Sequence, residues 1–235
     1  SQVEIVDFQS VGVNHTLESA SSDISLARFS SVGQTGGERA IQAKFSQIQA
    51  DRLYLDNFST GLQISDSECR FEDLEINDTT YIGIDISGST VNMSRVRMTN
   101  CSGTQLNVHE ESEIIVKNST LDGMCDAGSS TLYFLNTTNI SAVGLSDGAE
   151  LYRMWWLDIY VNDTQGPIAG ADVRLFDKNF DLEKKFVTGT DGFARNVPAI
   201  ETIFTESGKE SMNPHRTEAA GDSWAHLNDT AYYVK

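Results

Sequence analysis

Short segments in which apolar and polar residues alternate dominate the first two thirds of the chain. Residues 62–64, 84–86 and 106–108 are examples. Alternation with a period of two is typical of β-strands that bury one face. Long apolar stripes with the period of a helix are nearly absent. The pattern therefore predicts an all-β fold.

The alternating segments recur at a nearly constant interval, and serines mark it. The aligned serines are 24, 21, 22 and 23 residues apart: Ser22, Ser46, Ser67, Ser89 and Ser112. Apolar residues follow at positions two, four, seven and nine, and only Ser31 and Ser119 break this rule clearly. The column at position two contains Ile24, Ile48, Cys69, Val91 and Ile114. A register held this long indicates that like residues stack in the folded chain.

Each repeat is expected to contain three short strands. The alternation breaks between positions four and seven, so the chain turns a corner there. A third strand precedes the next serine and is carried by Leu62 and Ile64, Ile84 and Ile86, Leu106 and Val108, and Leu132 and Phe134. Three strands in about 22 residues predict a parallel β-helix over residues 1–150, with five to six coils stacked roughly 4.8 Å apart.

The remaining residues, 151–235, follow a different pattern. Residues 152–161 form one long, mostly apolar segment, which predicts a single strand longer than those of the coils. Turn signals then follow about every ten residues, a spacing typical of antiparallel sheets. We expect a small antiparallel β-sandwich.

A motif within this second part resembles a known family. Its residues are Asp163, Gly166, Pro167, Ile168, Gly170, Ala171, Val173 and Leu175, then Thr188, Thr190, Asp191, Gly192 and Phe193. Their order is similar to that of the carboxypeptidase regulatory-like, or transthyretin-like, β-sandwich, although Pro167 follows Gly166 without the usual gap. The coils upstream resemble right-handed β-helix repeats of secreted carbohydrate-active proteins and archaeal surface proteins. The combination is similar to large archaeal cell-surface proteins, which implies an extracellular adhesive or structural module and does not by itself imply catalysis.

Charge and composition narrow the classes of function. Asp and Glu number 34 against 17 Lys and Arg, so the formal net charge is −17. This charge repels phosphate backbones and argues against nucleic-acid binding. No run of 18 apolar residues is present, so we expect no transmembrane helix. The first residue is Ser and no signal peptide is visible, which suggests a processed chain or an excerpt of a longer one.

Asn-x-Ser/Thr sequons are strongly enriched. They begin at ten of the fourteen asparagines: Asn14, Asn57, Asn77, Asn92, Asn100, Asn118, Asn136, Asn139, Asn162 and Asn228. Chance would give roughly three at the Ser and Thr content of this chain. The enrichment predicts N-linked glycans and an extracellular or cell-surface location.

Three of these asparagines have a structural alternative. Asn57, Asn77 and Asn100 follow their serines by ten or eleven positions and should share one corner. Asparagines at such corners can form a buried ladder in which amides hydrogen-bond from coil to coil. A ladder asparagine cannot also carry a sugar, so both interpretations stay open for this trio.

The three cysteines divide into one buried residue and one pair. Cys69 lies in an inward column and should be an apolar, buried thiol. Cys101 and Cys125 follow successive serines by twelve and thirteen positions, which should bring their Cα atoms within disulfide range. We predict a Cys101–Cys125 bridge and an oxidising compartment. Two unlinked thiols at a turn are the alternative.

An enzyme is the main competing class, because β-helix proteins often cleave acidic polysaccharides. Hydrolases and lyases need carboxylates clustered on one face. Only Asp73 and Glu75 approach such a pair, and Arg52, Arg95 and Arg97 flank them. We interpret this patch as a salt-bridged face. The histidines show no metal-ligand spacing, so no catalytic, cofactor-binding or metal-binding residue is assigned.

Several acidic turns are candidate sites for loosely bound structural Ca²⁺. They occur at Asp78, Asp122, Asp126 and Asp177. Carboxylates in turns are possible calcium ligands, but solvated turns are the simpler interpretation. We expect no cofactor.

The sequence favours a structural glycoprotein that self-associates into a surface layer, sheath or filament, or acts as an adhesin module. A β-helix has two open ends with unpaired backbone groups, which must be capped or paired with another copy. Residues 2–8 alternate cleanly and are expected to pair with the first coil or with a neighbouring molecule. A carbohydrate-binding or polysaccharide-cleaving β-helix protein is the alternative.

Overall fold

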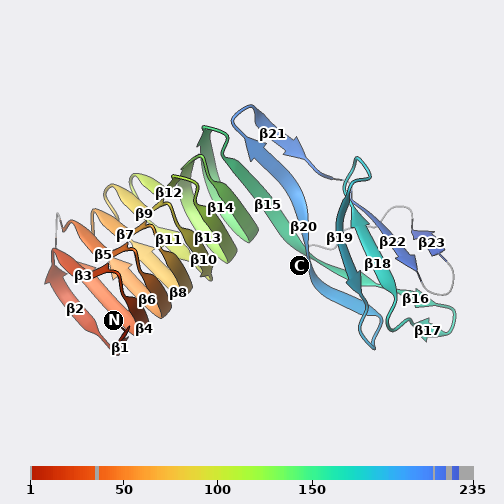
Figure 1. Ribbon diagram of the computed structural model, residues 1–235, viewed down its shortest axis with the longest axis horizontal. Coiled ribbons are helices and arrows are strands. Elements are labelled where there is room, and N and C mark those ends of the chain that lie inside the picture. Colours follow the sequence, from red (N-terminus) through yellow and green to blue (C-terminus); the bar gives the residue numbers. More distant parts are fainter. Residues whose placement is uncertain (1, 35–36, 214, 221–223, 228–235) are drawn as a thin grey trace. The chain divides into compact units, whose positions relative to one another are not determined.

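Strands are the only regular elements in the described part of the chain, so the predicted all-β fold is confirmed (Figure 1). The computed structural model describes residues 2–34, 37–213, 215–220 and 224–227. The chain divides into two compact units, Ser1–Leu151 with Phe204–Gly208 and Tyr152–Ile203 with Lys209–Lys235. The first unit is a parallel β-helix, and the second contains small antiparallel sheets.

The β-helix has about seven turns. Its strands are β1 (Gln2–Val6), β2 (Gln9–Val13), β3 (His15–Ala20), β4 (Asp23–Gly33), β5 (Arg39–Lys44), β6 (Gln47–Asp56), β7 (Thr60–Ser65), β8 (Glu68–Asn77), β9 (Ile82–Ser87), β10 (Thr90–Ser94), β11 (Arg97–Thr99), β12 (Thr104–His109), β13 (Glu113–Gly128) and β14 (Thr131–Ser146). Residues 2–20 add a turn to the predicted number, because β1 and β2 pair in parallel with β4, and β3 pairs with β5. The N-terminal segment thus pairs with its own chain.

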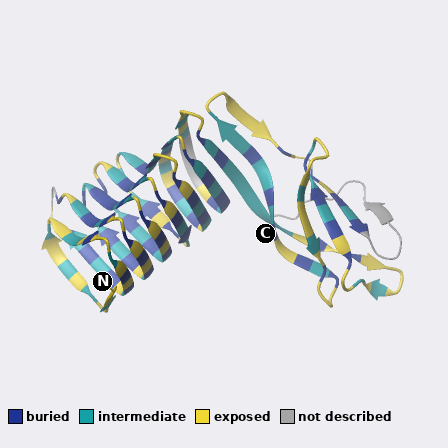
Figure 2. Ribbon diagram, in the orientation of Figure 1, coloured by how far each residue is buried: buried dark blue, intermediate teal, exposed yellow. Residues whose placement is uncertain are grey.

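The predicted inward columns are present. Ile48 is paired with Cys69, Cys69 with Val91, and Val91 with Ile114. All four side chains are buried, and the alternation of buried and more exposed residues along each strand is visible in Figure 2. A single turn cannot bury its apolar side chains by itself. Stacking of identical positions therefore builds one continuous core.

The first corner of each turn uses a single residue in the left-handed backbone region. At the first corner this residue lies within the strand in most turns and directly after a shorter strand in the others, with φ between 50° and 58° in Asp7, Arg28, Arg52, Asp73, Arg95, Asn118 and Asn136. One such residue interrupts the two-residue alternation and redirects the chain while both neighbours stay extended. This explains why the apolar spacing lengthens from two to three residues at the predicted corner.

The aligned serines form a ladder of hydrogen bonds at another corner. The backbone N–H of each serine donates to Oγ of the serine one turn further on, at 3.0 Å for Ser46 to Ser67 and for Ser67 to Ser89, and at 3.1 Å for Ser89 to Ser112 and for Ser112 to Ser130. The Oγ of Ser67 in turn donates to the carbonyl of Ser65 at 2.6 Å. The ladder satisfies buried polar groups that the strands leave open at this corner.

One turn of the β-helix is short, and two predictions fail there. Ser130 follows Ser112 by only 18 residues, since β13 runs through a region where other turns have a corner. Leu132 and Phe134 were expected in the third-strand column, but they pair with residues 114 and 116 of the first-strand column. Their place beside Leu106 is taken by Cys125.

The predicted Cys101–Cys125 disulfide is wrong for the same reason. Cys125 pairs with Leu106, five residues beyond Cys101, and its side chain lies in the core. Cys101 lies in the segment between β11 and β12, where its Sγ is 3.7 Å from the carbonyl oxygen of Thr99. Both are free thiols, as is Cys69. The cysteines therefore give no indication of an oxidising compartment.

The second unit is built on antiparallel pairs. β18 (Asp172–Phe176) lies between β19 (Leu182–Val187) and β22 (Arg216–Ala220), and β23 (Trp224–Leu227) pairs with β22. β16 (Asn162–Asp163) and β17 (Gly166–Pro167) form a hairpin. The predicted long strand is present as β15 (Glu150–Tyr160), which pairs with β20 (Phe193–Thr205), and β21 is Gly208–Ser211.

Motif residues of the second unit hold its turns. Oδ1 of Asp163 accepts the backbone N–H of Gly166 at 3.1 Å, and Oγ1 of Thr188 accepts that of Ala171 at 2.9 Å. Oδ1 of Asp191 accepts the N–H of Phe193 at 3.1 Å. These contacts explain why Asp and Thr occur at fixed places in the motif.

Candidate functional site

Sequon asparagines lie on the outside of the protein wherever their side chains are described. The exposed ones are Asn14, Asn100, Asn118 and Asn162, and the half-buried ones are Asn57, Asn77, Asn92 and Asn136. Asn139 is in β14 but its side chain is not described, and Asn228 lies outside the described residues. N-linked sugars need accessible amides, so this placement fits their addition.

Two of the half-buried amides take part in the structure of a corner. Nδ2 of Asn57 donates to the carbonyl of Gly33 at 3.2 Å, and Nδ2 of Asn77 donates to Oε1 of Glu75 at 3.2 Å. Oδ1 of Asn77 also accepts a hydrogen bond from Oγ1 of Thr99. In both residues the nitrogen that would carry a sugar is engaged.

The asparagine ladder considered for Asn57, Asn77 and Asn100 is not continuous. Asn57, Asp78 and Asn100 occupy the corner, with φ values of 61°, 50° and 55°. Asn77 lies one residue earlier and pairs with Thr99. Asp78 therefore interrupts the row, and the three asparagines do not stack on one another.

The patch at Asp73 is an ion-paired corner. The guanidinium of Arg95 contacts Asp73, with Nη2 3.0 Å from Oδ2, and reaches Oε2 of Glu72 at 3.2 Å. Hydrogen bonding to Arg95 lowers the pKa of Asp73, and the pKa of Glu72 is lowered by Arg70 and Arg95. A carboxylate held in its charged form by arginine is a poor general acid. This agrees with our interpretation of a salt-bridged face.

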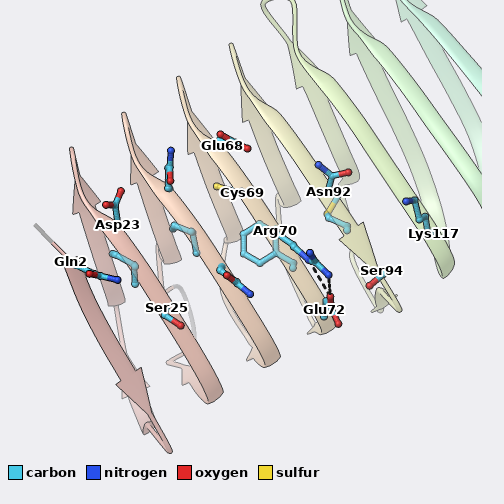
Figure 3. A pocket seen from close by; sticks show the side chains of 16 residues that line it. Gln2, Asp23, Ser25, Glu68, Cys69, Arg70, Glu72, Asn92, Ser94 and Lys117 are labelled. Atoms are coloured by element: carbon cyan, nitrogen blue, oxygen red, sulfur yellow. Dashed lines mark hydrogen bonds and ion pairs between the residues drawn. The ribbon is translucent and has the colours of Figure 1, made fainter.

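A groove lies elsewhere, along the outer face of the first strands of successive turns (Figure 3). It crosses β1, β4, β6, β8, β10 and the start of β13, and its volume is about 780 Å³. Amides are frequent in its lining and come from Gln2, Gln47, Gln49 and Asn92. Asp73 and Glu75 do not line it.

Charged groups of both signs lie in this polar groove. Arg70 and Lys117 supply the positive charge, and Asp23, Glu68 and Glu72 the negative charge. Nε of Arg70 donates to Oε1 of Glu72 at 3.1 Å. Sequence reasoning did not single out these residues. The signal was present at the position three after each serine, where Ser25, Gln49, Arg70 and Asn92 follow one another.

The thiols lie where their reactivity is low. Burial raises the pKa of Cys69 to about 12 and that of Cys125 to about 12. Burial also raises the pKa of Cys101, which is only half-buried. Thiolates are the reactive form, so none of these thiols is activated for nucleophilic chemistry at neutral pH.

Two further features are absent from the described ranges. Nowhere in them do three or more His, Cys, Asp or Glu side chains gather as metal ligands would. Nor do those ranges include a helix with the length and apolar character needed to cross a bilayer. Asp177, one of the possible calcium ligands, instead accepts the backbone N–H groups of Asn179 and Asp181 through Oδ1, both at 2.8 Å.

Comparison with known proteins agrees with the architecture of the first unit. Residues 34–144 match the family model described as a right handed beta helix region. No curated protein and no solved structure matches the chain. Together with the parallel pairing of its turns, the match identifies the first unit as a right-handed parallel β-helix.

Proposed function

We propose that this protein is an extracellular structural glycoprotein, a subunit that self-associates into a surface layer, sheath or filament or serves as an adhesin module. The observation that carries the proposal is the placement of the sequons, none of whose described side chains is buried. An excess of sequons over chance, with four of the described asparagines exposed and none buried, fits a surface selected for sugar attachment.

The β-helix fits a mechanical role. The serine ladder joins turn to turn inside a corner, and ion pairs such as those of Arg28 with Asp7 and Arg95 with Asp73 join turns on the outside. Every turn is therefore tied to its neighbours by the core, the strand pairing and side-chain contacts. Such a stack resists bending and suits a rigid spacer or wall element.

The first turn offers a surface for self-association. Among the described residues, β1, β2 and β3 pair on one side only, with β4 and β5. Val3, Val6 and Val11 are exposed on these strands, Val11 by 80%. Unpaired backbone groups beside exposed apolar side chains are a template for another strand. In our proposal a second copy supplies that strand.

For the second unit we propose the transthyretin-like sandwich. The antiparallel strands β18, β19, β22 and β23 and the motif turns at Asp163, Thr188 and Asp191 support it. By analogy with archaeal cell-surface proteins, this unit would be an accessory module that follows the β-helix in the chain.

The same surfaces support our proposal of a non-enzymatic role. The carboxylates closest to a catalytic pair are Asp73 and Glu75, and both are engaged, Asp73 by Arg95 and Glu75 by Asn77. A hydrolase needs one carboxyl group that can donate a proton. In this proposal the pair stabilises the fold.

The proposal is tested on protein purified from cells that attach N-linked sugars. We expect sugars in its mass spectrum, and concentration-dependent polymers in light scattering and negative-stain microscopy. Val11→Lys should weaken polymerisation, because a lysine on an edge strand opposes pairing. Val187→Lys is the matched control, since Val187 is exposed on β19 in the other unit. A protein without sugars that stays monomeric at high concentration would contradict the proposal.

The polar groove supports a second candidate function, the binding of a carbohydrate. Amides and paired charges along a groove are suited to the hydroxyl groups of a sugar chain, which both donate and accept hydrogen bonds. Gln49, Arg70 and Asn92 follow one another from turn to turn, as repeating sugar units would require.

Calorimetry with neutral and acidic polysaccharides tests this second candidate. The double variant Gln49→Ala with Arg70→Ala should abolish binding, whereas Gln42→Ala, on β5 outside the groove, should leave it unchanged. Binding that survives the double variant would exclude the groove. Chain cleavage that depends on Asp73 and Glu75 would instead indicate an enzyme.

A further inference from the structure

Two sequon asparagines lie one above the other at the first corner of the β-helix. Asn118 and Asn136 occupy equivalent positions in successive turns, since Lys117 pairs with Leu135 and Ser119 with Thr137. Both are in the left-handed region, with φ of 50° and 51°. Nδ2 of Asn136 donates a hydrogen bond to Oδ1 of Asn118 at 2.9 Å. The two side chains are therefore in direct contact.

The two amides differ in their readiness to accept a sugar. Asn118 is exposed, whereas Asn136 is half-buried and its Nδ2 is the donor of the shared hydrogen bond. In N-glycosylation Nδ2 attacks C1 of the first sugar of a lipid-linked oligosaccharide. The lipid phosphate leaves with the bonding electrons, and Nδ2 loses one proton. This attack requires Nδ2 to face solvent and the transferase.

We propose that Asn118 and Asn136 act as one glycosylation site, in which a sugar on Asn118 excludes a sugar on Asn136. Successive turns are about 4.8 Å apart, which is too close for two sugar rings that leave the same corner side by side. A sugar on Asn118 also covers the half-buried amide of Asn136. The inference rests on the proposed function, because it presumes that the protein is glycosylated.

The corner explains why such a contact can exist. Other turns carry arginine or aspartate at this position, including Arg52, Asp73 and Arg95, and these residues form ion pairs. In the last two turns the position is held by Asn118 and Asn136, whose amides replace the ion pair by a neutral hydrogen bond. The pair is thus a site where a structural contact and a modification compete for one nitrogen.

Mass spectrometry of the glycosylated protein tests the inference. Trypsin releases residues 118–153 as one peptide, since the nearest flanking basic residues are Lys117 and Arg153. Fragmentation that retains sugars then assigns each one to its asparagine. We expect one sugar chain on the pair, at Asn118. Sugars on both asparagines of one molecule, or on neither, would overturn the inference.

Two variants distinguish exclusion by a sugar on Asn118 from an Asn136 amide that is inaccessible in any case. Asn118→Gly tolerates the positive φ and removes both the sugar and the hydrogen-bond acceptor. Thr120→Ala destroys the Asn118 sequon but keeps the Asn118 side chain. Both should shift the sugar to Asn136, whereas the control Asn162→Gln should not. An unmodified Asn136 in both variants would overturn the inference.

The outcomes also separate this inference from the proposed function. If no sequon of the protein carries a sugar, the glycoprotein proposal fails and the inference fails with it. If Asn92, Asn100 or Asn162 carries sugar while Asn118 and Asn136 are modified together, only the inference fails.

Discussion

The backbone N–H of Ser67 donates a hydrogen bond of 3.0 Å to Oγ of Ser89, which lies one turn further along the β-helix. Ser89 is only 4% exposed, and its Oγ also donates to the carbonyl of Ser87 at 2.6 Å. One hydroxyl thus satisfies a donor and an acceptor at a buried corner. Repeated along the stack, this arrangement ties each turn to the next.

Replacing one serine of this ladder should destabilise the β-helix. Ser89→Ala leaves the buried N–H of Ser67 without its acceptor, and we expect a loss of about 1–3 kcal/mol in the free energy of unfolding. Urea denaturation followed by circular dichroism measures it. Ser25→Ala, at an exposed strand position, should change stability by less than about 0.5 kcal/mol. Equal effects of the two substitutions would show that the ladder contributes nothing.

A β-branched residue at a corner with positive φ should lower the stability of the protein. Arg52 has a φ of 58°, and valine at this φ is strained, so Arg52→Val should destabilise the protein by about 1–2 kcal/mol. Gln49→Val places the same side chain on an extended, exposed position of the same strand and should be close to neutral. The difference between the two urea midpoints reports chiefly the backbone strain, because the ion pair that Arg52 forms with Asp51 is exposed and contributes little to stability. A neutral Arg52→Val would mean that the corner relaxes without strain.

The thiols should react slowly and in a fixed order. Since burial raises the pKa of Cys69 and of Cys125 to about 12, the thiolate fraction at pH 8 is on the order of one in ten thousand. Iodoacetamide should modify half-buried Cys101 first and the other two only on unfolding. Denatured, unreduced protein should take up the reagent at all three cysteines. Uptake at only one cysteine would indicate that the other two form a disulfide, contrary to the structure.

The Arg95 corner should contribute stability that depends on pH. Hydrogen bonding to Arg95 lowers the pKa of Asp73, so the folded state binds protons less readily than the unfolded state. The contribution is therefore complete above the unfolded pKa of Asp, about 4, and is lost as the pH falls through the folded value. Arg95→Gln should lower the urea midpoint at pH 7, and the difference should shrink at pH 3 and in high salt.

Arg97→Gln provides the control for this experiment. Arg97 is exposed on β11, and among the described residues it takes part in no ion pair. Its substitution should leave the midpoint nearly unchanged at either pH. A difference between Arg95→Gln and the parent protein that persists at pH 3 would assign the effect to packing instead of charge.

Much of the β-helix was predictable because the spacing of apolar residues indicates its repeat. Ile48, Cys69 and Val91 lie in one column since each is two positions after a serine, and a parallel stack places equal positions opposite one another. The corner at Arg52 was also predictable, because it interrupts the alternation. The groove was not predictable, because the sequence pattern of outward polar residues is the same whether the surface that they form is flat or concave.

The sequence by itself determined the period, the inward columns and the first corner, because burying one side of every turn requires a constant spacing. Only the tertiary structure decided that the serines bond from turn to turn and that the turn after Ser112 is short. That shortening moves Cys125 opposite Leu106 and places Asn136 against Asn118. This turn is three to six residues shorter than the turns before it, and a corner is lost because β13 pairs along its length with β14, a long-range pairing that local sequence does not record.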